Sequence, residues 1–298
     1  MTTSLVLHQF KGALTSALKR GPYAQAPLPA AALAAPPTTP DPRRVRRYAQ
    51  VCGYDPEATT LPPTYPHLMA FPLTLALMAR RDFPFPLLGL VHTRIELSQH
   101  RPLTLDGALR LTVRAEGPHP HRKGTAFGLV TEAEQDGETV WHSRSTYLCR
   151  HRTTAPGTGP ENTSREQTRP GPPLPAVATW RLPGALGRRY ASVSGDRNPI
   201  HLHPLTARAF GFPRAIAHGM WTFARCLAAH ETADLSTAEA DFKAPVLLPA
   251  EVTYAADPAT GAFALRGAGE EEKLHLTGLV RRTAGPGPHP FGATGGAG

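Results

Sequence analysis

Residues 190–204 read Tyr190-Ala-Ser-Val-Ser-Gly-Asp-Arg-Asn-Pro-Ile-His-Leu-His-Pro204, which places a carboxylate, an amide and an imidazole within six residues. These side chains, of Asp196, Asn198 and His201, are of the kinds that move protons and orient small polar molecules. The glycine and proline among them form turns, which can direct the three side chains toward one point. The stretch therefore predicts an active-site loop.

A second stretch, Ile216-Ala-His-Gly-Met220, opens an apolar run that ends near Ala229 and predicts a buried helix. The first N–H groups of a helix have no intrahelical partner and can stabilise a developing negative charge. Because glycine allows close approach of the backbone, the N–H of Gly219 is the best candidate for that task.

The two halves of the chain share a repeat. Residues 46–53, Arg-Arg-Tyr-Ala-Gln-Val-Cys-Gly, match residues 188–195, Arg-Arg-Tyr-Ala-Ser-Val-Ser-Gly, at six of eight positions. Downstream, Pro66-His-Leu-Met69 resembles Ala217-His-Gly-Met220, and each precedes an apolar run. Each half is therefore expected to be one copy of a single fold.

The spacing within the two copies differs. Tyr48 and His67 are 19 positions apart, whereas Tyr190 and His218 are 28 positions apart. The excess falls around the segment that carries Asp196, so the second half is expected to perform the chemistry and the first to support it. Because His67 persists in the half without that segment, we interpret His218 as a residue of the helix start rather than a proton carrier.

After each apolar helix the pattern changes to strands. In the first half, strands are predicted at 89–97, 108–114, 125–133 and 139–148, with Asp136-Gly137 as the hairpin turn between the last two. In the second half, strands are predicted at 238–248, 251–255, 262–266 and 274–281. One long helix followed by an antiparallel meander, twice, is an α+β arrangement in which each helix packs on the concave face of its sheet.

Stretches rich in proline and glycine divide the chain. We expect an N-terminal arm at 1–42 with an early helix at 5–18, a first domain at 43–152, a flexible linker at 153–176, a second domain at 177–284 and a flexible tail at 285–298.

The composition narrows the partners and the compartment. The net charge of +9 suits an anionic small molecule or an acidic carrier protein, but the basic residues form short scattered doublets, so no nucleic-acid partner is expected. No window is apolar enough to span a membrane and no signal-peptide core begins the chain. The three cysteines are not spaced in pairs, which favours reduced thiols. A cytoplasmic protein is therefore expected.

Residues 190–220 resemble the signature of the MaoC-like dehydratases, also called hydratase 2 or (R)-specific enoyl-CoA hydratases, which have the hotdog fold. The matching residues are Tyr190, Ala191, Ser194, Gly195, Asp196, Asn198, Pro199, Ile200, His201, Pro204, Ala207, Gly211, Phe212, Ile216, Ala217, His218, Gly219 and Met220. The duplicated layout resembles double-hotdog members in which one half keeps the catalytic residues. The resemblance thus implies two antiparallel sheets, each wrapped on a long central helix.

The resemblance also implies a reaction, the reversible dehydration of (3R)-hydroxyacyl thioesters to trans-2-enoyl thioesters. The substrates would be thioesters of coenzyme A (CoA) or acyl-carrier protein in fatty-acid metabolism, with no cofactor. Asp196 and His201 would hold and deprotonate the water that attacks C3, and Asn198 would orient the substrate or the pair. Gly219 would bind the thioester oxygen, and Ala217 and Met220 would also contact the substrate.

One position departs from the family pattern. The family commonly has His-x-Asp-Pro, whereas this chain has His201-Leu-His-Pro204. The change raises the alternative of a metal site, because Asp196, His201 and His203 are all metal-ligand types. The match of the surrounding motif to the family is stronger evidence than the presence of three residues of metal-ligand type, so no metal is expected.

Two other functions are compatible with the sequence. A hotdog acyl-thioesterase would hydrolyse the thioester instead of hydrating the alkene. A non-catalytic subunit for acyl-thioester binding or assembly would follow if His203 marks decay of the site. Since two hotdogs already make a pseudo-dimer, a monomer and a homodimer both fit the sequence.

Overall fold

The computed structural model describes residues 19, 21, 23–24, 26–153, 174–230, 235–269 and 272–282. The helix expected at 5–18, most of the linker expected at 153–176 and the tail expected at 285–298 lie outside the described residues. No helix in the described ranges is long and apolar enough to cross a membrane.

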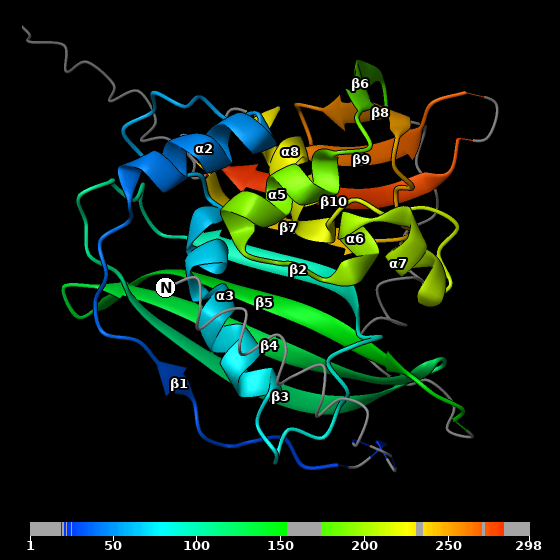
Figure 1. Cartoon of the computed structure of the whole chain (residues 1–298). Coiled ribbons are helices and arrows are strands. Elements are labelled where there is room, and N and C mark those ends of the chain that lie inside the picture. Colours follow the sequence, from blue (N-terminus) through cyan, green and yellow to red (C-terminus); the bar gives the residue numbers. More distant parts are fainter. Residues whose placement is uncertain are drawn as a thin grey trace, which may run out of the picture.

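The described strands form one antiparallel sheet in the order β1-β3-β4-β5-β2-β7-β10-β9-β8-β6 (Figure 1). Strands β1 to β5 make one half and β6 to β10 the other, so that the two predicted sheets are joined edge to edge through β2 and β7. The bounds are β1 (Leu33–Ala34), β2 (Val91–Gln99), β3 (Arg110–His121), β4 (Gly124–Gln135), β5 (Glu138–Arg150), β6 (Ala176–Leu182), β7 (Leu235–Phe242), β8 (Ala250–Asp257), β9 (Ala262–Gly267) and β10 (Leu274–Arg282).

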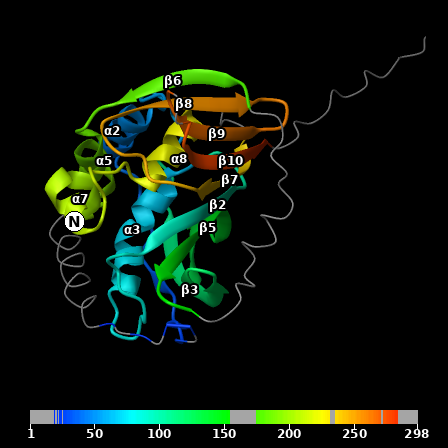
Figure 2. The same cartoon turned by 90° about the vertical axis from the view of Figure 1, so that its right-hand side faces the viewer.

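The helices lie on one side of this curved sheet, with α3 packed on β3 and β4 and α8 packed on β9 (Figure 2). This is the packing that the two apolar runs predict. The bounds are α2 (Pro42–Cys52), α3 (Tyr65–Met78), α5 (Leu186–Ser194), α6 (Pro199–Leu202), α7 (Pro204–Ala209) and α8 (Gly219–Ala228).

The predicted strands are present, but two of them end several residues away from the predicted position. The strand predicted at 108–114 continues to His121. The hairpin turn is confirmed, since Asp136 and Gly137 have φ angles of 55° and 84°, the left-handed pair that a tight two-residue turn requires. The strand predicted at 238–248 instead ends at Phe242. The residues beyond it pair with the segment before α8, where Ala217 N–H donates to the Val246 carbonyl at 2.9 Å. Strands β1 and β6 were not predicted, because β1 has only two residues and β6 begins at the end of the stretch interpreted as a linker.

The sequence repeat corresponds to a pair of capped helices, α2 and α5. Each ends at a glycine in the left-handed conformation, Gly53 with φ 83° and Gly195 with φ 81°. A side chain at such a position is strained, which explains why both copies keep glycine. The two helices contact each other, and the rings of Tyr48 and Tyr190 lie 6.1 Å apart. The repeat therefore encodes a contact between the two halves of the chain.

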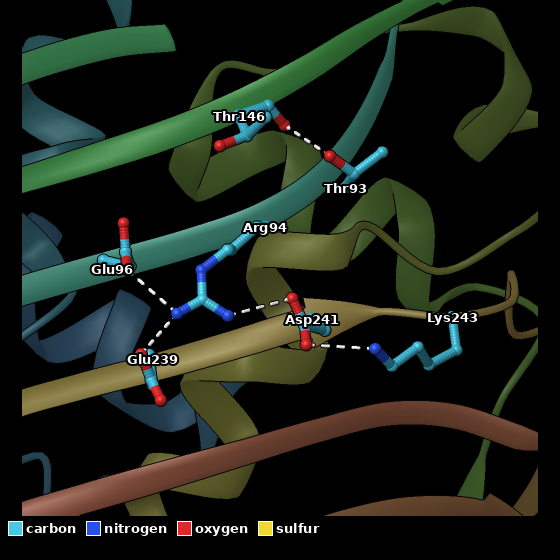
Figure 3. A network of polar contacts seen from close by, with 7 residues as sticks. All are labelled: Thr93, Arg94, Glu96, Thr146, Glu239, Asp241 and Lys243. Carbon is cyan, nitrogen blue, oxygen red and sulfur yellow. Dashed lines mark hydrogen bonds and ion pairs between the residues drawn. The ribbon is translucent and has the colours of Figure 1, made fainter. Parts of the chain in front are cut away.

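An ion-pair network spans the junction of the two half-sheets (Figure 3). Arg94 of β2 contacts Glu96 at 2.9 Å, Asp241 at 3.1 Å, and Glu239. Lys243 also reaches Asp241, at 3.0 Å. Burial alone would lower the pKa of Arg94, but its carboxylate partners together raise it. Arg94 is the shared cation of this network.

We expect Arg94→Met to lower the free energy of unfolding by about 1–2 kcal/mol, because Glu96 and Glu239 lie directly opposite each other in the register and would then repel. Because the network is partly exposed, this loss of free energy is smaller than that expected for a fully buried ion pair. Urea unfolding measures the change, with the exposed Arg110 replaced by Met as the control. Equal stability of the two variants would contradict this role.

Candidate active site

The loop between α5 and α6 is held by its own hydrogen bonds. Asp196 N–H donates to the Ser194 hydroxyl at 3.1 Å, and Asn198 N–H donates to Asp196 Oδ1 at 3.1 Å. The Asn198 side chain accepts from Ile200 N–H at 3.4 Å and so caps α6. Asn198 thus orients Asp196 through its backbone, while its side chain fixes the start of the helix that carries His201.

His201 is buried and has a defined tautomer. Its Nδ1 lies 2.8 Å from the Ile216 carbonyl, and because a carbonyl only accepts, Nδ1 carries the proton. The Nε2 lone pair is then available as a base. Burial lowers the pKa of His201, although the Asp196 charge and the Ile216 hydrogen bond oppose the shift. A neutral imidazole at neutral pH is the form that can accept a proton.

The structure adds His218 to this group. It holds the N-cap position of α8, as its interpretation as a helix-start residue implies, but its side chain makes no capping hydrogen bond. Its ring stacks on His201 with 3.7 Å between centroids, and its Nε2 donates to the Asp196 carbonyl at 3.1 Å. Burial, and then the neighbouring His201, lower the pKa of His218 well below its usual value. His218 is therefore a neutral wall of the site that fixes Asp196 and His201.

The polar atoms of Asp196, His201 and His218 lie within 4.8 Å of one another. One water can bridge such a gap, since two hydrogen bonds of about 2.8 Å span up to about 5.6 Å. A metal ion fits less well, because it must lie near the plane of each imidazole that binds it, at about 2.0–2.1 Å. Two rings stacked at 3.7 Å with 25° between their planes do not share such a point. The arrangement suits water and proton transfer.

His203 does not join the group, so the metal set that includes it is wrong. Its side chain is exposed and accepts from Leu205 N–H at 3.2 Å, which caps α7. Aspartate, common at this position in the family, is also a good N-cap residue. The change from Asp to His thus keeps a helix cap and leaves the site itself unaltered.

A cavity of about 970 Å³ opens beside these residues and is lined by both halves of the chain. From the second half it is lined by Asp196, Asn198, His201, Ala217, His218, Gly219 and Met220, and from the first half by His67, Phe71, Leu90, His92 and Tyr147, among others. All the predicted site residues therefore face one cavity.

Gly219 is the first residue of α8, where the backbone N–H has no intrahelical partner. A Cβ atom there would lie 3.2 Å from the Phe242 ring, so the glycine also permits tight packing under the helix start. The N–H of Ala217 donates to the Val246 carbonyl and is therefore not free to bind a ligand.

Sequence reasoning missed several supporting residues. Tyr190 is buried, and its ring centroid lies 4.8 Å from that of His218. Tyr147 comes from the first half, and burial, with a smaller effect of the Asp196 charge, raises its pKa. Gly187 of α5 lies against the backbone of His201, where a Cβ atom would be 1.9 Å from the carbonyl oxygen. The sequence repeat could have identified Gly187, because the equivalent residue in the half without the loop is Val45.

The buried histidines predict acid sensitivity of the fold. The pKa values of His201 and His218 are lowered in the folded state, so below about pH 6.5 the unfolded chain binds protons that the folded chain does not. Their stabilising contribution is therefore complete above that pH and is lost as the pH falls, at about 1.4 kcal/mol per pH unit for each residue. Urea unfolding from pH 7.5 to 5 measures the slope, which His218→Gln is expected to reduce by about 1.4 kcal/mol per pH unit. An unchanged slope would refute this account.

The site combines a carboxylate and a neutral imidazole, placed to hold one water, with the N-terminus of a helix. It lies in a cavity shared by two halves, each a helix packed on a sheet. These features define a double-hotdog hydro-lyase. The MaoC-like domain profile matches residues 163–258. A curated relative, 3-hydroxyacyl-thioester dehydratase X of Mycobacterium tuberculosis, is 41% identical over 212 residues, which cover 70% of this chain and 74% of the relative. The chain belongs to this family of MaoC-like dehydratases and is an enzyme.

Solved structures agree with that assignment. HtdX of Mycobacterium tuberculosis matches with a TM-score of 0.72 and 33% identity, over 85% of this chain and 100% of the other. A second protein of that organism, described as having a double hotdog fold, matches with a TM-score of 0.51 and 16% identity, over 87% of this chain and 97% of the other. The predicted α+β double-hotdog fold is thus confirmed.

Proposed function

We propose that the enzyme reversibly dehydrates (3R)-hydroxyacyl thioesters of CoA or acyl-carrier protein to trans-2-enoyl thioesters, with Asp196 and His201 as the catalytic pair. The observation that carries this proposal is the tautomer of His201, whose Nδ1 is committed to the Ile216 carbonyl while its Nε2 is left as a base beside Asp196. The name of the 41% identical relative supports the reaction.

In the hydration direction, one water lies between the Asp196 carboxylate and His201 Nε2. Nε2 takes a proton as the water oxygen bonds to C3, and the electron pair of the alkene moves toward the thioester oxygen. Gly219 N–H, at the positive end of α8, stabilises that oxygen. The imidazolium, stabilised by the Asp196 charge, then gives its proton to C2. One water has been added and the site is restored, and dehydration follows the same path in reverse.

The first half has a supporting role in this proposal. Residues 43–152 and 177–284 would each form one hotdog unit, and the first, which lacks the catalytic loop, would supply the wall for the acyl chain. Phe71, Leu90 and Leu148 offer an apolar surface in that part of the cavity. The cysteines in the described residues, Cys52, Cys149 and Cys226, are free and buried, which supports a reducing compartment such as the cytoplasm. A monomer or a homodimer would both serve.

The test follows enoyl-thioester absorbance with crotonyl-CoA and longer enoyl-CoA and enoyl-carrier substrates, together with a free-thiol assay and chiral analysis of the product. Hydration to the (3R)-hydroxy product without thiol release supports the proposal. Thiol release without hydration would make the protein a thioesterase, and inactivity on every chain length and carrier would make it a binding subunit. A (3S) product would overturn the stereochemical part of the proposal.

A further inference from the structure

A continuous column of buried rings joins the core of the first half to His201. In order, its members are Tyr65, Tyr48, Tyr190, His218 and His201, with 5.4, 6.1, 4.8 and 3.7 Å between successive ring centroids. We call these five residues the ring column. Each of them is at most 8% exposed. Because protein interiors are close-packed and transmit strain, a shift at one end of the column is felt at the other.

The ring column crosses from one half to the other at two residues that the sequence repeat makes equivalent. Tyr48 belongs to α2, and Tyr190 is its counterpart in α5. Tyr190 contacts His218 of its own half, whereas Tyr48 contacts Tyr65 of its own half and Tyr190 of the other. The first half therefore reaches the catalytic group through Tyr48.

Helix α2 holds Tyr48 in place and also contacts the helix that follows His218. The Tyr48 hydroxyl lies 2.7 Å from Thr64 Oγ1, a hydrogen bond made entirely within the first half. The indole N–H of Trp221, in α8, donates to the Val51 carbonyl of α2 at 2.9 Å. The position of the His218 ring therefore depends on α2 in two ways, through the ring column and through α8.

We infer that Tyr48, a residue of the half without the catalytic loop, is a positioning residue for His201 and acts through Tyr190 and His218. This inference rests on the proposed function, which makes His201 the base. The hydrogen bond to the Ile216 carbonyl fixes one edge of the His201 ring, and the stacked His218 ring supports its face. Support of that face matters to the rate, because a displacement of about 1 Å can cost about 10²-fold.

The test replaces Tyr48 by Leu, which removes the ring, and by Phe, which keeps it. We expect Tyr48→Leu to lower kcat for hydration of crotonyl-CoA by about tenfold or more and to change KM by less than about threefold, because the substrate contacts remain. Tyr48→Phe should keep kcat within about threefold of wild type, since the Tyr54 hydroxyl, 3.4 Å from Thr64 Oγ1, still offers that group a partner. Tyr48→Met gives the same comparison if Tyr48→Leu does not fold.

Phe83→Leu is the matched control. Phe83 is a fully buried ring of the first half that contacts Phe85 and Phe127 and lies outside the ring column. This variant should lose stability in urea, as Tyr48→Leu does, but keep wild-type kcat. An equal loss of kcat in the two variants would make Tyr48 an ordinary core residue and overturn the inference.

A double variant tests the route through His218. If Tyr48 acts through that ring, Tyr48→Leu should lower kcat by less than about twofold in a His218→Gln background, where the ring contact is already absent. Full losses that multiply in the double variant would contradict the inference.

Nitrogen-15 NMR of the histidine side chains, with signals assigned from His201→Gln and His218→Gln, separates this inference from the proposed function. The ring signals of His201 and His218 should shift in Tyr48→Leu and remain at their wild-type positions in Tyr48→Phe and Phe83→Leu. Such a shift supports the inference even if the wild type hydrates no thioester, an outcome that would refute the proposed function alone. Unchanged ring signals in Tyr48→Leu would overturn the inference.

Discussion

His201→Gln is expected to lower kcat for enoyl-thioester hydration by about 10³-fold, while KM changes by less than about threefold. The glutamine amide retains hydrogen-bonding capacity in the pocket but has no basic nitrogen to accept a proton from water. The expected loss lies within the range of a positioned general base, and it falls on kcat because the lost interaction acts in the transition state. Steady-state kinetics with crotonyl-CoA in the hydration direction measure it.

The matched control is His203→Asn, two residues along the chain. His203 is exposed and caps α7, and asparagine preserves the cap, so this variant should keep wild-type kcat. A large loss in His203→Asn, or wild-type activity in His201→Gln, would refute the assignment of the base.

The pH dependence of the wild type gives a second measure of the same assignment. Because the pKa of His201 is lowered in the folded enzyme, kcat/KM should be level near neutral pH and fall only below about pH 6.5, where Nε2 becomes protonated. The Asp196 charge raises the pKa of His201, so Asp196→Asn should move the acid limb of the residual activity to lower pH.

The parts of the site that the sequence predicted are those close together in the chain. Asp196, Asn198 and His201 lie within six residues, so their chemistry was visible without a fold. His218 was placed at the helix start because the repeat shares it with His67, but its contact with His201 depends on how the segment before α8 meets α6. That contact is set by the hydrogen bond between Ile216 N–H and the Ile200 carbonyl, which no local pattern reveals.

The fold shows the same limit. Long strands and a tight turn were predictable, whereas β6 was not, because it begins at the end of the stretch interpreted as a linker and lies at the edge of the sheet, with Val177 exposed. The contribution of Tyr147 depends on the pairing of β2 with β7, which brings the two halves together across the sheet. Contacts between distant parts of the chain decide such features.

Comparison of the two copies shows what the catalytic loop requires of α5. Val45 of α2 is buried in the first half, and the equivalent residue of α5 is Gly187, whose missing side chain leaves room for the backbone of His201. A side chain at Gly187 and the observed position of α6 are mutually exclusive, because the Cβ atom would lie 1.9 Å from the His201 carbonyl oxygen and 2.9 Å from its carbon. The glycine is thus a requirement of the catalytic half.

Gly187→Ala is therefore expected to lower kcat by about 10²-fold or more, although alanine favours helices and the substitution touches no catalytic side chain. The obstructing atoms belong to the backbone, so α6 must move, and a displacement of about 1 Å at a reacting group is enough for such a loss. Unfolding by urea should show a parallel loss of about 1–3 kcal/mol from the overpacked contact.

Gly184→Ala provides the control, since the nearest atom to its Cβ would be Pro249 Cδ at an ordinary 3.8 Å, and both kcat and stability should remain close to wild type. Val45→Ala provides the converse, a loss of stability from a cavity in the first half with kcat retained. Wild-type activity in Gly187→Ala would mean that His201 tolerates displacement, and the account of a base fixed by α5, α6 and the Ile216 carbonyl would then be wrong.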